Sequence, residues 1–177
     1  MSDSDDFAHR LEALENRAAI TEVVLRYARA IDRCDEAMLR SCFHPDARHR
    51  HGNFDGASAD FCGFALEIVR KVELSHHQLG PVSIELAGEV AYAETYYTAL
   101  HRFGATPPPS GEPHEDRFSG GRYVDRFERR DGQWRIAERR GISEWMRYEP
   151  AADRGFYDGP ADQRGRRDRD DPVYRGG

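Results

Sequence analysis

The chain has 177 residues and a formal net charge of −6, with 38% hydrophobic and 33% charged residues. This length is enough for one domain with a hydrophobic core and short for two. The mean hydropathy is −0.82, and no run approaches the roughly 18 apolar residues that span a bilayer, so membrane insertion is excluded. The acidic start "MSDSDDFAHR" lacks the basic and apolar regions of a secretory signal, so we expect a cytoplasmic protein.

Cysteine spacing and charge distribution exclude further classes of protein. Cys34, Cys42 and Cys62 form an odd set without a C-x-x-C pair, which argues against a disulfide framework and against a structural zinc site. Acidic and basic residues are interspersed rather than gathered in a basic stripe, so nucleic acid is not expected as a partner. The expected partner is a small-molecule substrate.

Three helices are expected in the first part of the chain. Apolar side chains recur every three or four positions in residues 7–33, which predicts a long amphipathic helix. Asp35 is the expected N-cap of a short helix that ends near Phe43, before the proline of "HPD". Ser58 is the expected cap of a third helix that runs to Val72. The apolar stripe of the first helix consists of Ile20, Val24, Tyr27 and Ile31.

From residue 81 onward the sequence changes to a strand pattern, with segments rich in β-branched and aromatic residues. Turns are expected at "GE" (88–89) and, more strongly, at "DG" (131–132). A proline-rich loop is expected within 104–121. The expected strands cover 81–86, 89–103, 120–130 and 133–141. Helices followed by an antiparallel meander indicate the α+β class.

Residues 150–177 differ in composition from the rest of the chain, because they are rich in arginine and aspartate and poor in aliphatic side chains. Such a composition is typical of an irregular segment. We therefore expect a folded domain over residues 1–149, followed by an irregular tail that packs on this domain or on a neighbouring subunit.

Three segments carry a resemblance to a known family: "RAAITEVVLRYARAIDRCD", "SHHQLGP" and "GGRYVDRFERRDGQWRIAERRG". Together with the order of helices and strands, they resemble the SnoaL-like branch of the nuclear transport factor 2-like superfamily over roughly residues 10–148. The resemblance implies a cone-shaped, strongly curved antiparallel sheet wrapped around a pocket, with three N-terminal helices. It also implies a homo-oligomer, dimer or trimer, formed through the outer face of the sheet.

Within that branch, the chain is most similar to scytalone dehydratase and hexachlorocyclohexane dehydrochlorinase, which are cofactor-free lyases built on an Asp–His pair. The resemblance places the acidic residue at Asp32 of "AIDRCD" and the histidine at His77 of "HHQLGP". A second pocket histidine of the dehydratase matches His101, and an arginine of the dehydrochlorinase points to Arg139. The dehydratase has tyrosines where this chain has Ile31 and His51, so scytalone itself is not the expected substrate. The expected substrate contacts are Tyr27, His51, Tyr97 and Arg139.

The two adjacent histidines leave one question open. Neighbouring strand residues point to opposite faces, so only one of His76 and His77 is expected to face a pocket. Simple alternation groups His76, rather than His77, with the apolar side chains of 82–86. The "GP" at 80–81 is suited to a β-bulge that reverses the alternation. We predict that His77 faces the pocket and keep His76 as the alternative.

These residues predict a cofactor-independent, dehydratase-like lyase that acts on a small cyclic or aromatic compound. His77 is the expected base and Asp32 fixes its tautomer. His101 is the third expected catalytic residue, since His101, Tyr27 or Tyr97 can donate a proton or hydrogen bond to a carbonyl or to departing hydroxide, and no metal or organic cofactor is required. An isomerase or cyclase using the same pair, or a non-catalytic small-molecule-binding protein, is the alternative. His49 and His51, two apart in the extended segment "HPDARHRHG", form a competing candidate site for zinc or iron.

Overall fold

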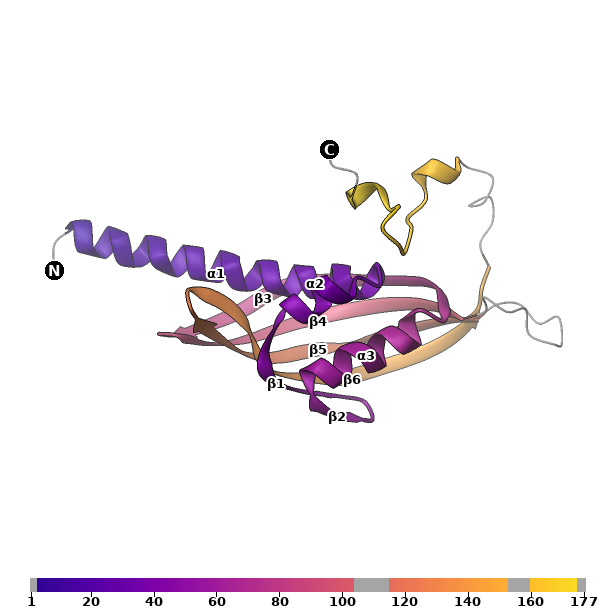
Figure 1. Cartoon of the computed structure of the whole chain (residues 1–177), viewed down its shortest axis with the longest axis horizontal. Coiled ribbons are helices and arrows are strands. Elements are labelled where there is room, and N and C mark those ends of the chain that lie inside the picture. Colours follow the sequence, from indigo (N-terminus) through magenta and orange to yellow (C-terminus); the bar gives the residue numbers. More distant parts are fainter. Residues whose placement is uncertain (1–2, 104–114, 153–159, 175–177) are drawn as a thin grey trace.

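A six-stranded curved sheet with three helices packed against one side forms the body of the protein (Figure 1). The structure is a computed structural model and describes residues 3–103, 115–152 and 160–174. The helices are α1 (Asp3–Asp32), α2 (Glu36–Ser41) and α3 (Ser58–Val69). The strands are β1 (Phe43–His51), β2 (Phe54–Ala57), β3 (Val72–Ala87), β4 (Val90–Phe103), β5 (Glu115–Arg130) and β6 (Gln133–Pro150). The predicted α+β class with three N-terminal helices is confirmed.

The strands are arranged in the order β2-β1-β6-β5-β4-β3. Strands β3 to β6 form the predicted antiparallel meander, whereas β1 pairs in parallel with β6, so the whole sheet is mixed. Both predicted turns are present, and Asp131 and Gly132 have φ values of 52° and 73°. Two successive positive φ values are what a type I′ hairpin turn requires. The expected proline-rich loop lies partly in 104–114, outside the described residues, and its remainder belongs to β5.

The first two helices begin and end close to the predicted positions. Asp35 caps α2, because the backbone N–H of Met38 donates to its carboxylate at 3.1 Å. The expectation that "HPD" ends this helix is wrong, since β1 already begins at Phe43. A strand accommodates Pro45 here because the pairing of β1 with β6 is interrupted between Phe43 and Arg48, so no ladder hydrogen bond is lost. Ser58 is the first residue of α3 rather than its cap, which is Ala57.

The alternation of inward and outward side chains along β3 reverses in the middle of the strand, and this reversal decides which histidine faces the candidate site. Leu79 pairs with Tyr97 and Val82 with Thr95, so β3 contains one residue more than β4 between these pairs. The predicted bulge at 80–81 is therefore confirmed. It allows His77 and, further along the strand, the buried Ile84 to face the same interior. His76 is exposed on the other face.

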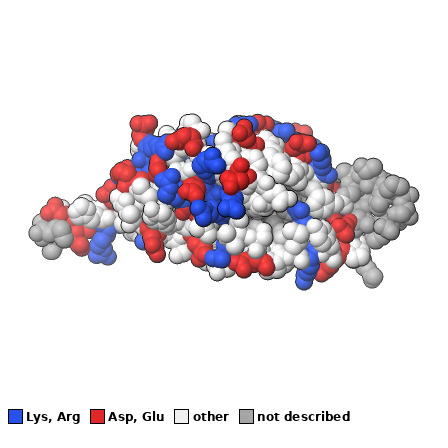
Figure 2. All heavy atoms as spheres, turned by 90° about the horizontal axis from the view of Figure 1, so that it is seen from below, with Lys and Arg blue, Asp and Glu red and all other residues white. Residues whose placement is uncertain are grey.

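The surface carries both charge signs. Figure 2 shows that lysine and arginine side chains on the face it presents are bordered by aspartate and glutamate. None of the described helices is both long and apolar enough to cross a membrane.

Candidate active site

Asp32 and His77 form a hydrogen-bonded pair where α1 ends beside β3. The Nδ1 atom of His77 lies 2.7 Å from Oδ1 of Asp32, and the backbone N–H of His77 donates to Oδ2 at 2.8 Å. The hydroxyl of Ser75 donates to Oδ1 at 2.8 Å. Both side chains of the pair are nearly enclosed, with 11% of Asp32 and 8% of His77 exposed. Residues of one strand thus fix both oxygens of a carboxylate presented by the last residue of a helix.

The surroundings of Asp32 favour its ionised form. Burial alone raises the pKa of Asp32, but the hydrogen bonds from the ring and the backbone of His77 and from the hydroxyl of Ser75 hold the pKa below its ordinary value. An ionised carboxylate only accepts hydrogen bonds, so we assign the ring proton of His77 to Nδ1. The free electron pair of the imidazole is then on Nε2, which leaves that nitrogen available as a base.

His77 lines a cavity of about 310 Å³ between α1, α3 and the sheet. This volume is at the lower end of the range for small-molecule sites. The lining is largely aromatic and aliphatic, and His76 is not part of it. Among the residues predicted from sequence, the cavity brings together His77, His101, Tyr27, His51 and Tyr97. Asp32 lies behind His77 rather than on the cavity wall.

His101 is the second histidine of the cavity and packs edge-on against His77. The two ring centroids lie 5.3 Å apart with the ring planes at 82°. Burial, reinforced by the nearby charge of Arg117, lowers the pKa of His101 to about 3, so the imidazole is neutral at pH 7. Its Nδ1 atom is buried and has no hydrogen-bond partner among the described residues. A neutral imidazole in this position can exchange a hydrogen bond with a ligand but supplies no imidazolium proton.

Arg139 does not line the cavity. Its side chain is fully buried and makes two hydrogen bonds to Asp125, at 2.6 and 2.7 Å. The guanidinium lies 4.0 Å from the ring centroid of Tyr27 and 4.3 Å from that of Tyr123. These two tyrosines do line the cavity. Arg139 therefore supports the aromatic wall from behind, and its charge is already paired.

The competing pair of histidines lies in different surroundings. His49 is buried with its ring stacked on Phe61, the centroids 3.4 Å apart, while His51 lines the cavity and packs against Gly141. A Cβ atom at position 141 would lie 2.5 Å from the His51 ring, so only glycine fits there. In the described part of the chain, no group of three or more His, Cys, Asp or Glu side chains is placed to hold a metal ion.

Two residues of the site, Ser75 and Arg117, are not among those predicted from the sequence. Ser75 fixes Asp32, and Arg117 lines the cavity opposite His101 in the pairing of β4 with β5. The guanidinium of Arg117 lies 4.9 Å from the centroid of the Phe103 ring, and its buried Nε has no hydrogen-bond partner among the described residues. Proline and glycine nearby suggested a loop at Arg117, and the polar run "EDR" at 115–117 gave no alternation that would indicate a strand.

A second, larger hollow of about 720 Å³ lies on the outer face of the sheet. Its lining includes Tyr96, Arg122, Glu144 and Trp145, and no histidine. Arg122 and Glu144 form an ion pair with each other, at 2.8 Å. The outer hollow thus offers no histidine and no unpaired carboxylate, and the candidate site is the smaller cavity that His77 and His101 line.

Acidification is expected to destabilise the protein through its buried histidines. Burial, the largest cause in each case, lowers the pKa of His49 to about 2, that of His51 to about 4 and that of His101 to about 3. Between these values and the ordinary 6.5, the unfolded chain binds protons that the folded chain does not. Stability therefore rises with pH in this window, and each histidine removes roughly 1 kcal/mol per pH unit as the pH falls below 6.5.

Urea unfolding at pH 7, 6 and 5 measures this effect. His49→Phe keeps the stacked ring and removes one titrating group, so its free energy of unfolding should depend less steeply on pH than that of the wild type. Equal slopes for His49→Phe and the wild type would contradict the assignment of His49 as a buried neutral histidine.

The curved sheet closed by helices matches the fold that comparisons with known proteins return. The sequence profile of the SnoaL-like domain matches residues 12–140. The chain belongs to this family. No curated protein matches it in sequence.

Solved structures show the same fold at low sequence identity. A protein from Novosphingobium aromaticivorans, provisionally assigned as scytalone dehydratase, is 19% identical with a TM-score of 0.66, covering 80% of this chain and 91% of its own. Hexachlorocyclohexane dehydrochlorinase LinA-type3 from Novosphingobium barchaimii is 19% identical with a TM-score of 0.66, covering 81% and 94%. A nuclear transport factor 2-like protein from Novosphingobium aromaticivorans is 24% identical with a TM-score of 0.61, covering 80% and 90%.

Proposed function

We propose that this protein is a cofactor-independent lyase that removes a proton and a leaving group from a small cyclic or aromatic compound. One observation carries the proposal. His77 makes hydrogen bonds to both oxygens of the Asp32 carboxylate, and its ring lines a cavity of about 310 Å³. A carboxylate that fixes the tautomer of an imidazole also stabilises the imidazolium that forms when the base takes a proton. The structural similarity to a dehydratase and a dehydrochlorinase supports the same reaction class.

The elimination begins when Nε2 of His77 takes a proton from a carbon next to a carbonyl group. The electron pair of that C–H bond forms an enolate, whose oxygen gains negative charge. When the enolate collapses, a C=C bond forms and the bond to the leaving hydroxyl group breaks. The departing hydroxide takes the proton from the His77 imidazolium and leaves as water, which returns His77 to its neutral form.

Arg117 and the neutral His101 are placed to stabilise the negative oxygen. The two residues face each other across the β4–β5 pair and both line the cavity. A guanidinium and an imidazole N–H in an enclosed site can donate hydrogen bonds to developing charge, which is worth far more there than in water. The Tyr97 hydroxyl is a further donor, and burial raises its pKa, so it stays protonated at neutral pH.

Arg117 is expected to favour ligands that carry an anionic oxygen. Replacing it in Arg117→Met should weaken binding of benzoate by about 10- to 100-fold, the effect of one charge-assisted hydrogen bond. Binding of benzamide, which has the same shape without the charge, should change little. Isothermal titration calorimetry with both probes measures the difference. Equal losses for the two probes would show that Arg117 acts through packing rather than through charge.

The proposed reaction is tested by incubating the protein in D₂O with a panel of cyclic β-hydroxy ketones and following the products by NMR. Elimination yields an unsaturated ketone and water. An isomerase would yield an isomer that keeps the hydroxyl group, and a binding protein would shift ligand signals without turnover. Loss of the hydroxyl group by the wild type but not by His77→Gln supports a lyase. Absence of any turnover or deuterium uptake across the panel would contradict the acid–base proposal and favour ligand binding.

A further inference from the structure

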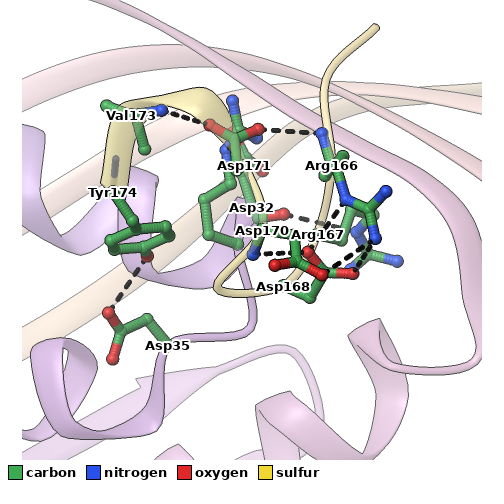
Figure 3. A network of polar contacts seen from close by, with 10 residues as sticks. Asp32, Asp35, Arg166, Arg167, Asp168, Asp170, Asp171, Val173 and Tyr174 are labelled. Atoms are coloured by element: carbon green, nitrogen blue, oxygen red, sulfur yellow. Dashed lines mark hydrogen bonds and ion pairs between the residues drawn. The ribbon is translucent and has the colours of Figure 1, made fainter. Parts of the chain in front are cut away.

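The C-terminal segment 160–174 lies across the ends of the helices that carry the candidate site (Figure 3). It contains two short 3-10 helices, Ala161–Gln163 and Pro172–Tyr174. Between them, the chain passes close to Asp32 and Asp35. None of the described residues of this segment lines the internal cavity, so the contacts lie behind the Asp32–His77 pair and not on its substrate side.

One side chain of this segment, Arg167, binds three different elements at once. Its guanidinium donates to the backbone carbonyls of Asp32 (at 3.3 Å), Val69 and Val72. Asp32 is the last residue of α1, Val69 is the last of α3, and Val72 is the first of β3. The carbonyls at a helix C-terminus have no partner within the helix, and a cation there is favoured by the helix dipole. Arg167 therefore supplies hydrogen-bond donors to the C-terminal carbonyls of α1 and α3 and to the first carbonyl of β3.

Two of the three elements that Arg167 joins, α1 and β3, carry the Asp32–His77 pair. Asp32 ends α1, whereas Ser75 and His77 lie on β3, shortly after Val72. The carboxylate makes three hydrogen bonds to β3 at 2.7–2.8 Å, which leaves little room for a shift of the helix end along the strand. Arg167 binds the backbone carbonyls of both Asp32 and Val72, and it therefore holds the end of α1 against the start of β3 on the side of the pair that faces away from the cavity.

Further contacts hold the segment in place around Arg167. The carboxylate of Asp35 accepts hydrogen bonds from Arg169 at 3.1 Å and from the Tyr174 hydroxyl at 3.0 Å. Asp171, which is 4% exposed, forms an ion pair with Arg33 at 3.1 Å. The buried Asp171 and the Tyr174 hydroxyl anchor the part of the segment that follows Arg167 to the α1–α2 corner, whereas the Arg169 side chain is 70% exposed and contributes less.

We propose that Arg167 is a positioning residue for the Asp32–His77 pair and that the C-terminal segment acts as a strap that delivers it. Arg167 touches neither the cavity nor His77. It acts by holding the C-terminal end of α1 against β3, so that the Asp32 carboxylate stays within hydrogen-bond reach of the His77 ring. This inference rests on the proposed acid–base function, although its structural content can be measured without a substrate.

The test compares Arg167→Ala and Arg167→Lys with the control Arg169→Ala in the full chain. The control removes a guanidinium from the same segment, but one that contacts Asp35 and not Asp32. NMR of protein labelled with ¹⁵N-histidine follows the hydrogen-bonded Nδ1 proton of His77. We expect this proton signal to exchange rapidly with water in Arg167→Ala, to be partly retained in Arg167→Lys and to match the wild type in Arg169→Ala.

Where a substrate is in hand, Arg167→Ala should lower kcat by about 10- to 100-fold with KM nearly unchanged, because a misplaced base affects the proton transfer more than the binding. A lower Tm with a wild-type Nδ1 signal would overturn the proposal and leave Arg167 with a purely structural role. Should Arg167→Ala fail to fold, Arg167→Lys carries the test, and a His77 signal identical to the wild type in that variant would overturn it. A protein without elimination activity whose His77 signal still depends on Arg167 would refute the proposed function alone.

Discussion

His77→Gln is expected to lower kcat/KM for elimination by about 10²–10⁴-fold, the usual contribution of a positioned general base. Glutamine keeps a polar side chain of similar reach but has no nitrogen that takes a proton at neutral pH. The matched control is His76→Gln, because His76 is the adjacent residue and is exposed on the opposite face of β3. Steady-state kinetics on the compound found in the NMR panel measures both variants. Equal losses in the two variants would contradict the assignment of His77 as the base.

Asp32→Asn separates the charge of the carboxylate from its shape. The amide retains one carbonyl oxygen as acceptor, but it adds an N–H group where the backbone N–H of His77 donates at 2.8 Å. Loss of the charge and the clash of two donors should reduce kcat/KM by a factor close to that of His77→Gln. The double variant Asp32→Asn/His77→Gln should be no slower than His77→Gln alone, since residues that act as a unit are not additive. Multiplied losses in the double variant would show that the two residues act independently.

The features of the fold that depend only on neighbouring residues could be predicted from the sequence. The "DG" turn at 131–132, the cap at Asp35 and the bulge at 80–81 all have local causes, namely positive φ, a side-chain acceptor and a proline without an N–H group. The bulge decided which histidine faces the cavity. The facing of His77 was therefore predictable, because the residues that reverse the strand alternation lie within four positions of it.

Features that depend on residues far apart in the chain were not predictable from these patterns. Pro45 was expected to end a helix because nothing near it indicates that β1 will pair in parallel with β6, the last strand along the chain. Arg139 was expected to bind substrate because its partner Asp125 is recognised only from the register of β5 and β6. Arg167 lies in a segment whose composition suggests an irregular tail, and its acceptors are backbone carbonyls, which leave no signature in the sequence.

The Arg139–Asp125 pair is expected to give the largest effect on stability. Arg139→Met leaves the Asp125 carboxylate buried without its partner and should lower the free energy of unfolding by about 3–5 kcal/mol. The matched control is Arg140→Met on the same strand, where the arginine is 61% exposed in its ion pair with Glu138 and where the change should stay below about 1 kcal/mol. Urea unfolding of both variants at pH 7 measures the difference. A loss in Arg139→Met no larger than that in Arg140→Met would contradict a buried, tightly paired guanidinium.

Removing both charges tests whether the cost comes from the orphaned carboxylate or from the lost contacts. In Arg139→Met/Asp125→Leu no charge is left unpaired, so the double variant should be more stable than Arg139→Met alone. Any remaining loss measures the packing of the guanidinium between Tyr27 and Tyr123. Because both tyrosines line the cavity, the double variant should also bind aromatic ligands more weakly even where its stability recovers. Stability restored with unchanged ligand binding would show that the aromatic wall does not need the cation behind it.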